Sequence, residues 1–197
     1  MPTDHTNRSR GRPRGTSARA LEVIALGLYS TVGFEETTVT DIAAAGGVSR
    51  RTFFRYFESK AAVLWNEFDS EVSELRAAFA AVDGDTPMMD AIRQVVVQVN
   101  HYRADDMPEL RTRMHLVGSV PALQASASPH YDAWERAVSE FAAMRTGLAA
   151  DSLIPLAVGR TTLAACRAAY EQWILIEGSD LTEHLDAALR ALGRGFK

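Results

Sequence analysis

The sequence has little of what several protein classes require. Its 197 residues include one cysteine, which excludes a disulfide framework and a zinc site built from cysteines. Its apolar runs, such as residues 173–176, are far shorter than the ~20 residues that a membrane-spanning helix needs. The N-terminus carries arginines with no apolar stretch after them, unlike a signal peptide. We therefore expect a soluble, cytoplasmic protein with no membrane partner.

Patterns typical of strands, catalytic sites and metal sites are also missing. No segment alternates apolar and polar residues over the length of a strand. The five histidines show no HExxH spacing or other metal-ligand pattern. Cys166 lies in a mostly apolar segment, which favours a position in the core. We expect no catalytic residues, no bound metal and no cofactor.

Basic residues are slightly fewer than acidic ones overall, 21 against 25, but they are concentrated near the start of the chain. The net charge of −4 combines nine basic and six acidic residues in residues 1–60 with twelve and nineteen in residues 61–197. A basic head on an acidic body indicates that the head meets a polyanion such as nucleic acid. A solvated basic tail without a partner is the alternative that charge alone leaves open.

Helical periodicity from residue 17 onward predicts an all-α protein of about nine helices. Residues 1–16 are polar and lack an apolar period, so we expect a disordered basic arm. We assign residues 17–60 to a helical head and residues 61–197 to a helical body. The stretch 120–128, which contains proline and serine, is expected to be a loop between two body helices.

Residues 38–57 carry the most informative pattern. Thr38 and Asp41 fit a capping box, Gly46-Gly47 a turn, and Ser49 the N-cap of a second short helix. This arrangement is typical of a helix-turn-helix, in which the second helix enters the major groove. The residues at its start and on its outer face that can contact bases or phosphates are Ser49, Arg50, Arg51, Thr52, Arg55 and Tyr56. A helical hairpin with a solvated basic face is the alternative.

Residues 21–64 resemble the DNA-binding head of the TetR family of bacterial transcriptional regulators, and residues 48–60 match its most characteristic segment almost position by position. The resemblance implies that Thr38 and Lys60 hold phosphates and that Arg50 to Thr52 and Arg55 face bases. Phe54 departs from the family, which often has a tyrosine there, so one phosphate-binding hydroxyl is missing. Through residues 103–138 the likeness extends to actinobacterial regulators of mycofactocin gene clusters.

The resemblance also implies how such a protein works. It implies a homodimer that binds a palindromic DNA operator, represses transcription and is released when a small effector enters the body. The dimer interface of the family is a four-helix contact made by the last two helices of each subunit. Residues 154–177 are apolar around most of a helix, and leucine recurs at 181, 185, 189 and 192, which indicates surplus apolar surface for such a partner.

A second signal for DNA lies in the N-terminal arm. Residues 10–15, Arg-Gly-Arg-Pro-Arg-Gly, resemble an AT-hook, in which an extended Gly-Arg-Pro core follows a narrow minor groove. Arg10, Arg12 and Arg14 would then contact A·T-rich DNA. A tail that binds phosphates without base preference is the alternative.

The candidate effector residues lie in the body. The candidate anion-binding group consists of Arg103, Arg111, Arg113 and His115. Aromatic candidates for a cavity lining are Trp134, Tyr170 and Trp173. A solvated helix face and plain core packing are the respective alternatives.

The body is rich in apolar side chains and shows few convergent polar groups, so we expect an apolar ligand. Members of the family that bind acyl-CoA thioesters make a long-chain acyl-CoA one candidate, whose phosphates the arginine group would meet. A small helical enzyme or an interaction module with an incidental basic tail is the rival hypothesis for the whole chain.

Overall fold

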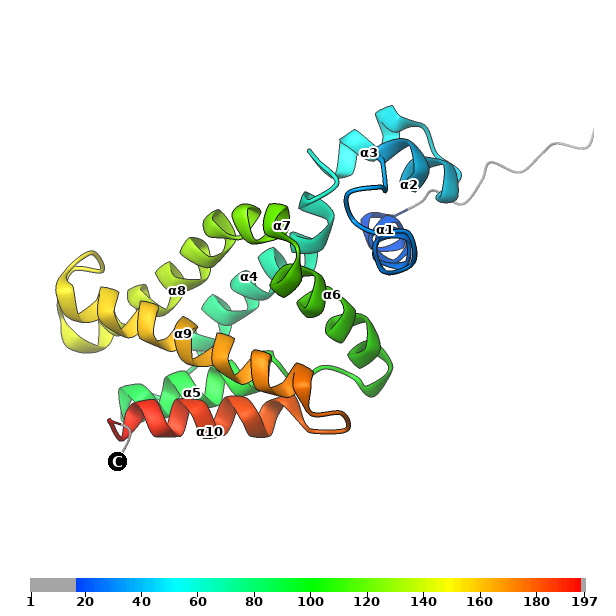
Figure 1. The fold of residues 1–197 in the computed structure, drawn as a ribbon. Helices are drawn as coiled ribbons and strands as arrows, with labels where there is room; N and C mark the ends of the chain where they lie inside the picture. Colours follow the sequence, from blue (N-terminus) through cyan, green and yellow to red (C-terminus); the bar gives the residue numbers. More distant parts are fainter. Residues whose placement is uncertain (1–16, 196–197) are drawn as a thin grey trace, which may run out of the picture.

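The computed structural model describes residues 17–195, and within this range the chain contains ten α-helices, two short 3-10 helices and no β-strand. In Figure 1 the first three α-helices form a small head at one end, and the remaining helices form a longer body. The all-α fold expected from the sequence is confirmed. The arm over residues 1–16, with Arg10, Arg12 and Arg14, lies outside the described residues.

The head consists of α1 (Ala18–Thr31), α2 (Val39–Ala45) and α3 (Arg50–Tyr56). The body consists of η1 (Ala62–Trp65), α4 (Asn66–Ala80), α5 (Met88–Val99), η2 (Ala104–Asp106), α6 (Met107–Ser119), α7 (Pro121–Ser126), α8 (Ser128–Thr146), α9 (Leu153–Leu175) and α10 (Leu181–Gly193).

Local capping forms the head helices as the sequence predicts. The side chain of Ser17 caps α1, Thr38 and Asp41 form the capping box of α2, and Ser49 caps α3. Between α2 and α3, Gly47 has a φ of 64°, a left-handed conformation that is costly for residues with a Cβ. The tight turn of the helix-turn-helix therefore depends on glycine at this position.

The segment over residues 120–128 is not the expected loop, because it contains α7. Pro121 occupies the first turn of this helix. N–H groups in the first turn make no hydrogen bond within the helix, so the lack of an N–H on proline costs nothing there. Leu123 is completely buried in the core of the head, which anchors the helix. A first-turn proline favours a helix start as well as a loop, and the sequence pattern alone did not separate the two. The count in the described range is accordingly ten helices instead of about nine.

The core of the head is completed by the body. Leu21, Ile42 and Phe53, one from each head helix, are fully buried. Leu116 of α6 and Leu123 of α7 belong to the same apolar cluster. Because α6 contributes to this core and packs against α1, a displacement of α6 acts directly on the head.

In the body, α8 and α10 both pack along α9, and α10 also packs against α5 (Figure 1). Phe79 of α4 stacks on Phe141 of α8, with ring centroids 4.4 Å apart. Where α9 crosses α8, a Cβ on Gly159 would lie 2.6 Å from the backbone oxygen of Glu135. This crossing therefore requires glycine. None of the helices in the described range has the length and apolar character needed to cross a membrane.

Three of the four leucines of α10 do not form the expected surplus surface, and only Leu192 lies partly exposed. Leu181, Leu185 and Leu189 are at most 1% exposed and fill the core of their own body. Exposed apolar surface lies at the two ends of α9 and in a groove between α9 and α10. The groove is lined by Thr161, Ala164, Ala165, Ala168, Ala188 and Leu192. The first three leucines of α10 thus stabilise the fold of one subunit, and the outward groove is lined by small side chains together with Leu192.

Candidate nucleic-acid interface and effector cavity

The α3 segment presents a basic face to solvent. Its exposed residues are Ser49, Arg50, Arg51, Phe54, Arg55 and Tyr56. Phe53 points inward and is fully buried, which fixes the rotation of the helix about its axis. Thr52 is partly buried, and its N–H donates to the Ser49 hydroxyl at 3.1 Å. The Arg55 guanidinium donates to the Tyr56 hydroxyl at 3.2 Å. The six residues predicted to contact DNA in this segment therefore lie together at the outer surface of the head.

Two residues expected to hold phosphates have partners within the head. Thr38 takes part in the capping box of α2. The Lys60 ammonium group donates to three backbone oxygens of the turn between α1 and α2, at 2.6 to 3.1 Å. It also lies 4.3 Å from the centroid of the Phe34 ring. Phosphate binding by Thr38 and Lys60 stays a prediction, and Lys60 has a structural role that the sequence did not indicate.

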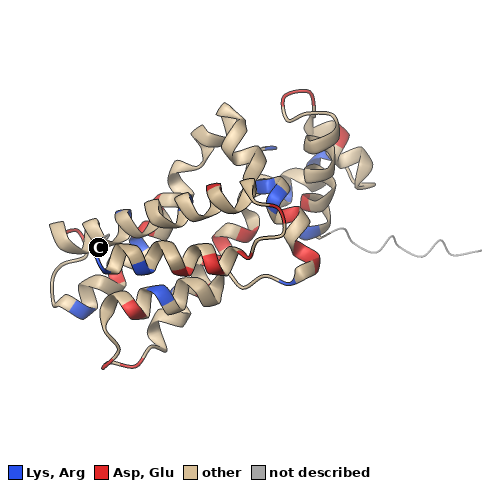
Figure 2. Cartoon of the chain, turned by 60° about the horizontal axis from the view of Figure 1, so that its bottom comes forward, with Lys and Arg blue, Asp and Glu red and all other residues tan. Residues whose placement is uncertain are grey.

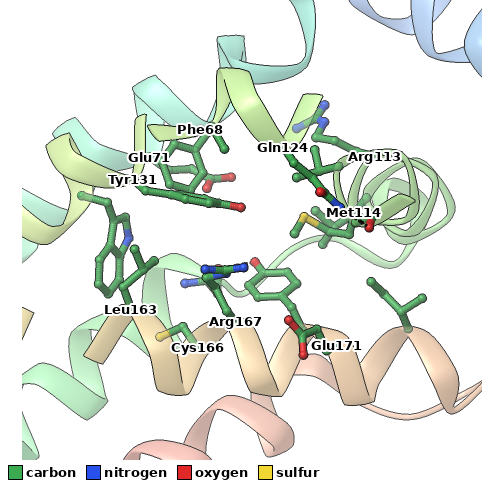
Figure 3. Close-up of a pocket in the computed structure, with 18 of the residues that line it drawn as sticks. Phe68, Glu71, Arg113, Met114, Gln124, Tyr131, Leu163, Cys166, Arg167 and Glu171 are labelled. Carbon is green, nitrogen blue, oxygen red and sulfur yellow. Dashed lines mark hydrogen bonds between the residues drawn. The ribbon is translucent and has the colours of Figure 1, made fainter. Parts of the chain in front are cut away.

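A cavity of about 590 Å³ lies within the body, with walls that include α4, α6, α8 and α9. Volumes of this size are typical of sites that enclose small molecules. Figure 3 shows Phe68, Met114 and Leu163 on its apolar walls and Arg167 reaching into it from α9, opposite Tyr131. Of the predicted effector residues, the cavity lining includes Arg113, Trp134 and Tyr170.

The other predicted effector residues lie elsewhere, so the structure does not assemble the arginine group into one site. Arg103 and His115 are exposed outside the cavity. Trp173 is fully buried, and its indole N–H donates to a backbone oxygen just after α9. The Arg111 guanidinium lies 4.0 Å from the Trp173 ring centroid and donates to the Trp173 backbone oxygen at 2.8 Å. Arg111 therefore caps the end of α9.

Basic and acidic positions lie side by side where the head meets the body (Figure 2). Arg113 is one of the ion-paired residues at this place, which we call the junction cluster. Its members are Arg19 and Glu22 of α1, Glu67 of α4, and Glu109 and Arg113 of α6.

The junction cluster joins three helices through ion pairs. Arg113 pairs with Glu22, with Glu67 at 2.6 Å and with Glu109 at 3.1 Å. Arg19 pairs with Glu67 at 2.7 Å and with Glu109 at 2.5 Å. The side chains of Glu22 and Arg113 are 0% and 6% exposed, and burial raises the pKa of the Glu22 carboxyl against the attraction of Arg113. The three carboxylates lie close enough to share a cation, and two guanidinium groups supply that charge.

The cavity also contains a hydrogen-bonded group that we call the polar chain, formed by Glu71, Tyr102, Tyr170 and Asn100. The Tyr102 hydroxyl donates to the Glu71 carboxylate at 2.6 Å and lies 3.4 Å from the Tyr170 hydroxyl. The Tyr170 hydroxyl donates to the Asn100 side-chain oxygen at 2.5 Å. Burial raises the pKa values of Glu71, Tyr102 and Tyr170.

The polar chain corrects the expectation that the body offers few convergent polar groups. Tyr102 has the spacing of an apolar stripe, and its hydroxyl partner Glu71 lies 31 residues earlier in the sequence. No local pattern signals such a contact. Cys166 also lines the cavity and is buried as expected, and burial raises the pKa of its thiol to about 12.

The fold and site define a helix-turn-helix regulator with a helical body that encloses a cavity. Residues 24–64 match the family of bacterial regulatory proteins named tetR, and residues 86–197 match the MftR C-terminal domain. The chain belongs to the TetR family of bacterial transcriptional regulators, with a C-terminal domain of the MftR type. This family is not a class of enzymes.

Two relatives are similar over most of their length. The chain is 33% identical over 186 residues to the candidate mycofactocin biosynthesis transcriptional regulator MftR of Mycobacterium tuberculosis, covering 94% of each protein. It is 30% identical over 168 residues to the HTH-type transcriptional regulator TcmR of Streptomyces glaucescens, covering 80% of this chain and 73% of that protein. The family expected from residues 21–64, and the likeness to mycofactocin-cluster regulators, are confirmed.

Solved structures share the fold. The TetR-family repressor FadR of Thermus thermophilus, solved with lauroyl-CoA, has a TM-score of 0.60 at 24% identity, covering 92% of this chain and 95% of that one. The fatty acid degradation regulator FadR of Bacillus halodurans has a TM-score of 0.62 at 16% identity, covering 92% and 96%.

Proposed function

We propose that this protein is a ligand-responsive repressor that acts in the cytoplasm and binds a palindromic operator as a homodimer. The observation that carries the proposal is the exposed basic face of α3, which the buried Phe53 and the Ser49 cap hold in place. Arg50, Arg51 and Arg55 would approach base edges, and the cap would be near phosphates. Arginines of the N-terminal arm would add contacts in a neighbouring minor groove or along the phosphates.

Dimerisation would use the groove between α9 and α10. Ala164 and Ala168 are exposed on α9, and Leu192 of α10 borders the same groove. Small side chains let helices approach closely, and a two-fold axis requires a self-complementary surface. Four helices, two from each subunit, would then bury this apolar face. Two recognition helices held in this way would reach half-sites about one DNA turn apart, roughly 34–36 Å.

The effector would bind in the cavity of about 590 Å³. Its apolar walls accept a hydrocarbon chain, and a long-chain acyl-CoA is the first candidate because a structural neighbour was solved with lauroyl-CoA. The predicted phosphate-binding role of the arginine group has no support from the geometry. Arg113 forms ion pairs with three glutamates, and Arg111 donates a hydrogen bond to a backbone oxygen at the end of α9.

Release from the operator would run through α6. Arg113 lines the cavity and also binds Glu22 of the head. An effector that displaces α6 would therefore move α1 and change the separation of the two recognition helices. Only an effector with different affinities for the two arrangements can shift their populations.

A DNA titration separates this proposal from the rival of a small helical enzyme or an interaction module. The full-length protein is titrated with random duplex DNA at two salt concentrations, with fluorescence anisotropy as the readout. A regulator should bind with affinity that falls steeply as salt rises, because phosphate contacts release counterions. A protein that fails to bind at low salt would contradict the proposed function.

A further inference from the structure

The cavity contains a carboxyl group whose position calls for a functional explanation. Glu71 lies in the cavity wall on α4, and it forms no ion pair with any residue in the described range. The nearby guanidinium of Arg113 is already shared by three other glutamates. A partly buried carboxyl without a cationic partner is unfavourable for folding, so its presence in a cavity points to a ligand.

The hydrogen bonds of the polar chain leave capacity for a ligand. One carboxylate oxygen of Glu71 accepts from Tyr102, and the other accepts no hydrogen bond from a described residue. Tyr170 donates to Asn100, whose amide group in turn donates to the backbone oxygen of Val96 at 2.8 Å. The chain is thus held at its far end by α5 and open at the Glu71 end. Both tyrosine hydroxyl protons are used within the chain, so an incoming hydroxyl or amide can donate to the unpaired oxygen of Glu71.

We propose that the polar chain is the subsite that selects the effector's polar group, and that it takes an uncharged hydrogen-bonding group, such as a hydroxyl or amide, in preference to a carboxylate. The apolar part of the effector lies against Phe68, Met114 and Leu163. The proposal rests on the proposed function, in that the cavity is the effector site. A carboxylate placed beside Glu71 brings two like charges together in a poorly solvated space.

Arg167 is the alternative anchor for an anionic effector. It lines the cavity, with its guanidinium 5.4 Å from the centroid of the Tyr131 ring, and no ion pair joins it to a residue of the described part. However, Glu171 follows one turn later on α9 and lines the same cavity, so its negative charge offsets that of Arg167. Arg167 is also exposed, which weakens its attraction for an anion by solvent screening.

A matched pair of fluorescent ligands tests the proposal on the full-length protein. Cis-parinaric acid and the corresponding alcohol have the same polyene chain and differ in the polar group alone. Their fluorescence rises on transfer into an apolar cavity. We expect the wild-type protein to bind the alcohol more tightly than the acid, by about tenfold or more, as expected for one poorly solvated pair of like charges.

Two substitutions assign the preference to the polar chain. Glu71→Gln should tighten binding of the acid and shrink the preference for the alcohol. Tyr102→Phe removes the hydrogen bond that positions the Glu71 carboxylate and should weaken binding of the alcohol. Asp132→Asn is the matched control, because it removes an exposed carboxyl from the same lining and should leave the preference for the alcohol in place. Circular dichroism confirms that each variant is folded.

The outcomes are distinct. Equal binding of acid and alcohol, or a preference unchanged in Glu71→Gln, would overturn the proposal and leave the proposed function intact. Tighter binding of the acid that is lost in Arg167→Gln would also overturn it, and would place the subsite at Arg167. If neither ligand bound the wild type or any variant, both the proposal and the cavity as the effector site would be contradicted.

Discussion

Arg113 and Glu22 form an ion pair between the body and the head, although they lie 91 residues apart in the sequence. Both side chains are almost completely removed from solvent. Arg113 also lines the cavity, so one guanidinium group is shared by the candidate effector site and the helix that carries the head. Its Nε–H is buried without a hydrogen-bond partner in the described part of the chain. A buried N–H without a partner costs free energy, so the junction cluster stabilises the fold less than a fully paired network would.

Removal of Arg113 should destabilise the fold strongly. Arg113→Met leaves Glu22 buried beside two further carboxylates, and breaking such a pair costs about 3–5 kcal/mol in the free energy of unfolding. Urea unfolding followed by circular dichroism measures the loss. Glu140→Gln is the matched control, because it breaks the exposed Arg76–Glu140 pair and should cost about 0–1 kcal/mol. Equal losses in the two variants would show that the junction cluster is no more than a surface network.

The Glu71 carboxyl should make stability depend on pH in a defined direction. Burial raises its pKa above the ordinary value of 4.5, so the folded protein binds more protons than the unfolded one between these two values. The stability that Glu71 contributes therefore falls as pH rises through this window. The Glu71→Gln variant has no carboxyl at this position, so its stability does not fall for this reason as pH rises. Its free energy of unfolding relative to the wild type should thus increase from pH 4.5 upward, in urea melts at a series of pH values. A difference that is constant with pH would contradict this.

Substitutions in and beside α3 should separate base contacts from structural support. Arg51→Ala, at an exposed position, should leave thermal stability unchanged, weaken specific binding by about 1–3 kcal/mol and relax base preference. Thr52→Ala should also relax base preference. Lys60→Ala should weaken binding to all sequences alike and lower the melting temperature, because three backbone oxygens lose their donor. Anisotropy titrations with specific and random DNA, together with thermal melts, test the set, and an identical pattern in all three variants would refute the assignment.

The dimer surface should respond to charge without loss of the fold. Ala168→Glu places a carboxylate in the exposed groove between α9 and α10 and should give folded monomers that lose operator binding. Ala77→Glu, at an exposed position on α4, is the control and should stay dimeric. Leu189→Glu should instead unfold the body, because Leu189 is 1% exposed in its own core. Sedimentation velocity at micromolar concentration distinguishes these results, and a dimeric Ala168→Glu variant would exclude this groove as the interface.

Features set by neighbouring residues could be predicted from the sequence. The Thr38–Asp41 capping box and the Ser49 cap depend on residues three positions apart, and both form as expected. The inward position of Phe53 and the outward position of Arg51 follow from the same helical period. These local rules were sufficient for the helix-turn-helix and for its exposed face.

Features that depend on tertiary pairing could not be predicted in the same way. From the sequence, Arg111 and Arg113 lie on one helix and are equally good candidates for binding an anion. The fold sends Arg111 to the end of α9 and Arg113 into three ion pairs. The prediction that the leucines of α10 form a dimer surface was wrong for a related reason. Periodicity shows which face of a helix is apolar, but not whether the same subunit or a second one covers that face.

The central claim is that two α3 helices read one palindromic operator. Selection of random duplex DNA by the full-length protein, followed by sequencing of the bound fraction, tests this most directly. We expect an enriched palindrome whose half-site centres lie about 10 base pairs, or a multiple of this, apart. We also expect that Arg51→Ala enriches the same spacing with relaxed bases at one position of each half-site. Enrichment of no sequence, or of a single site without two-fold symmetry, would contradict binding by two α3 helices.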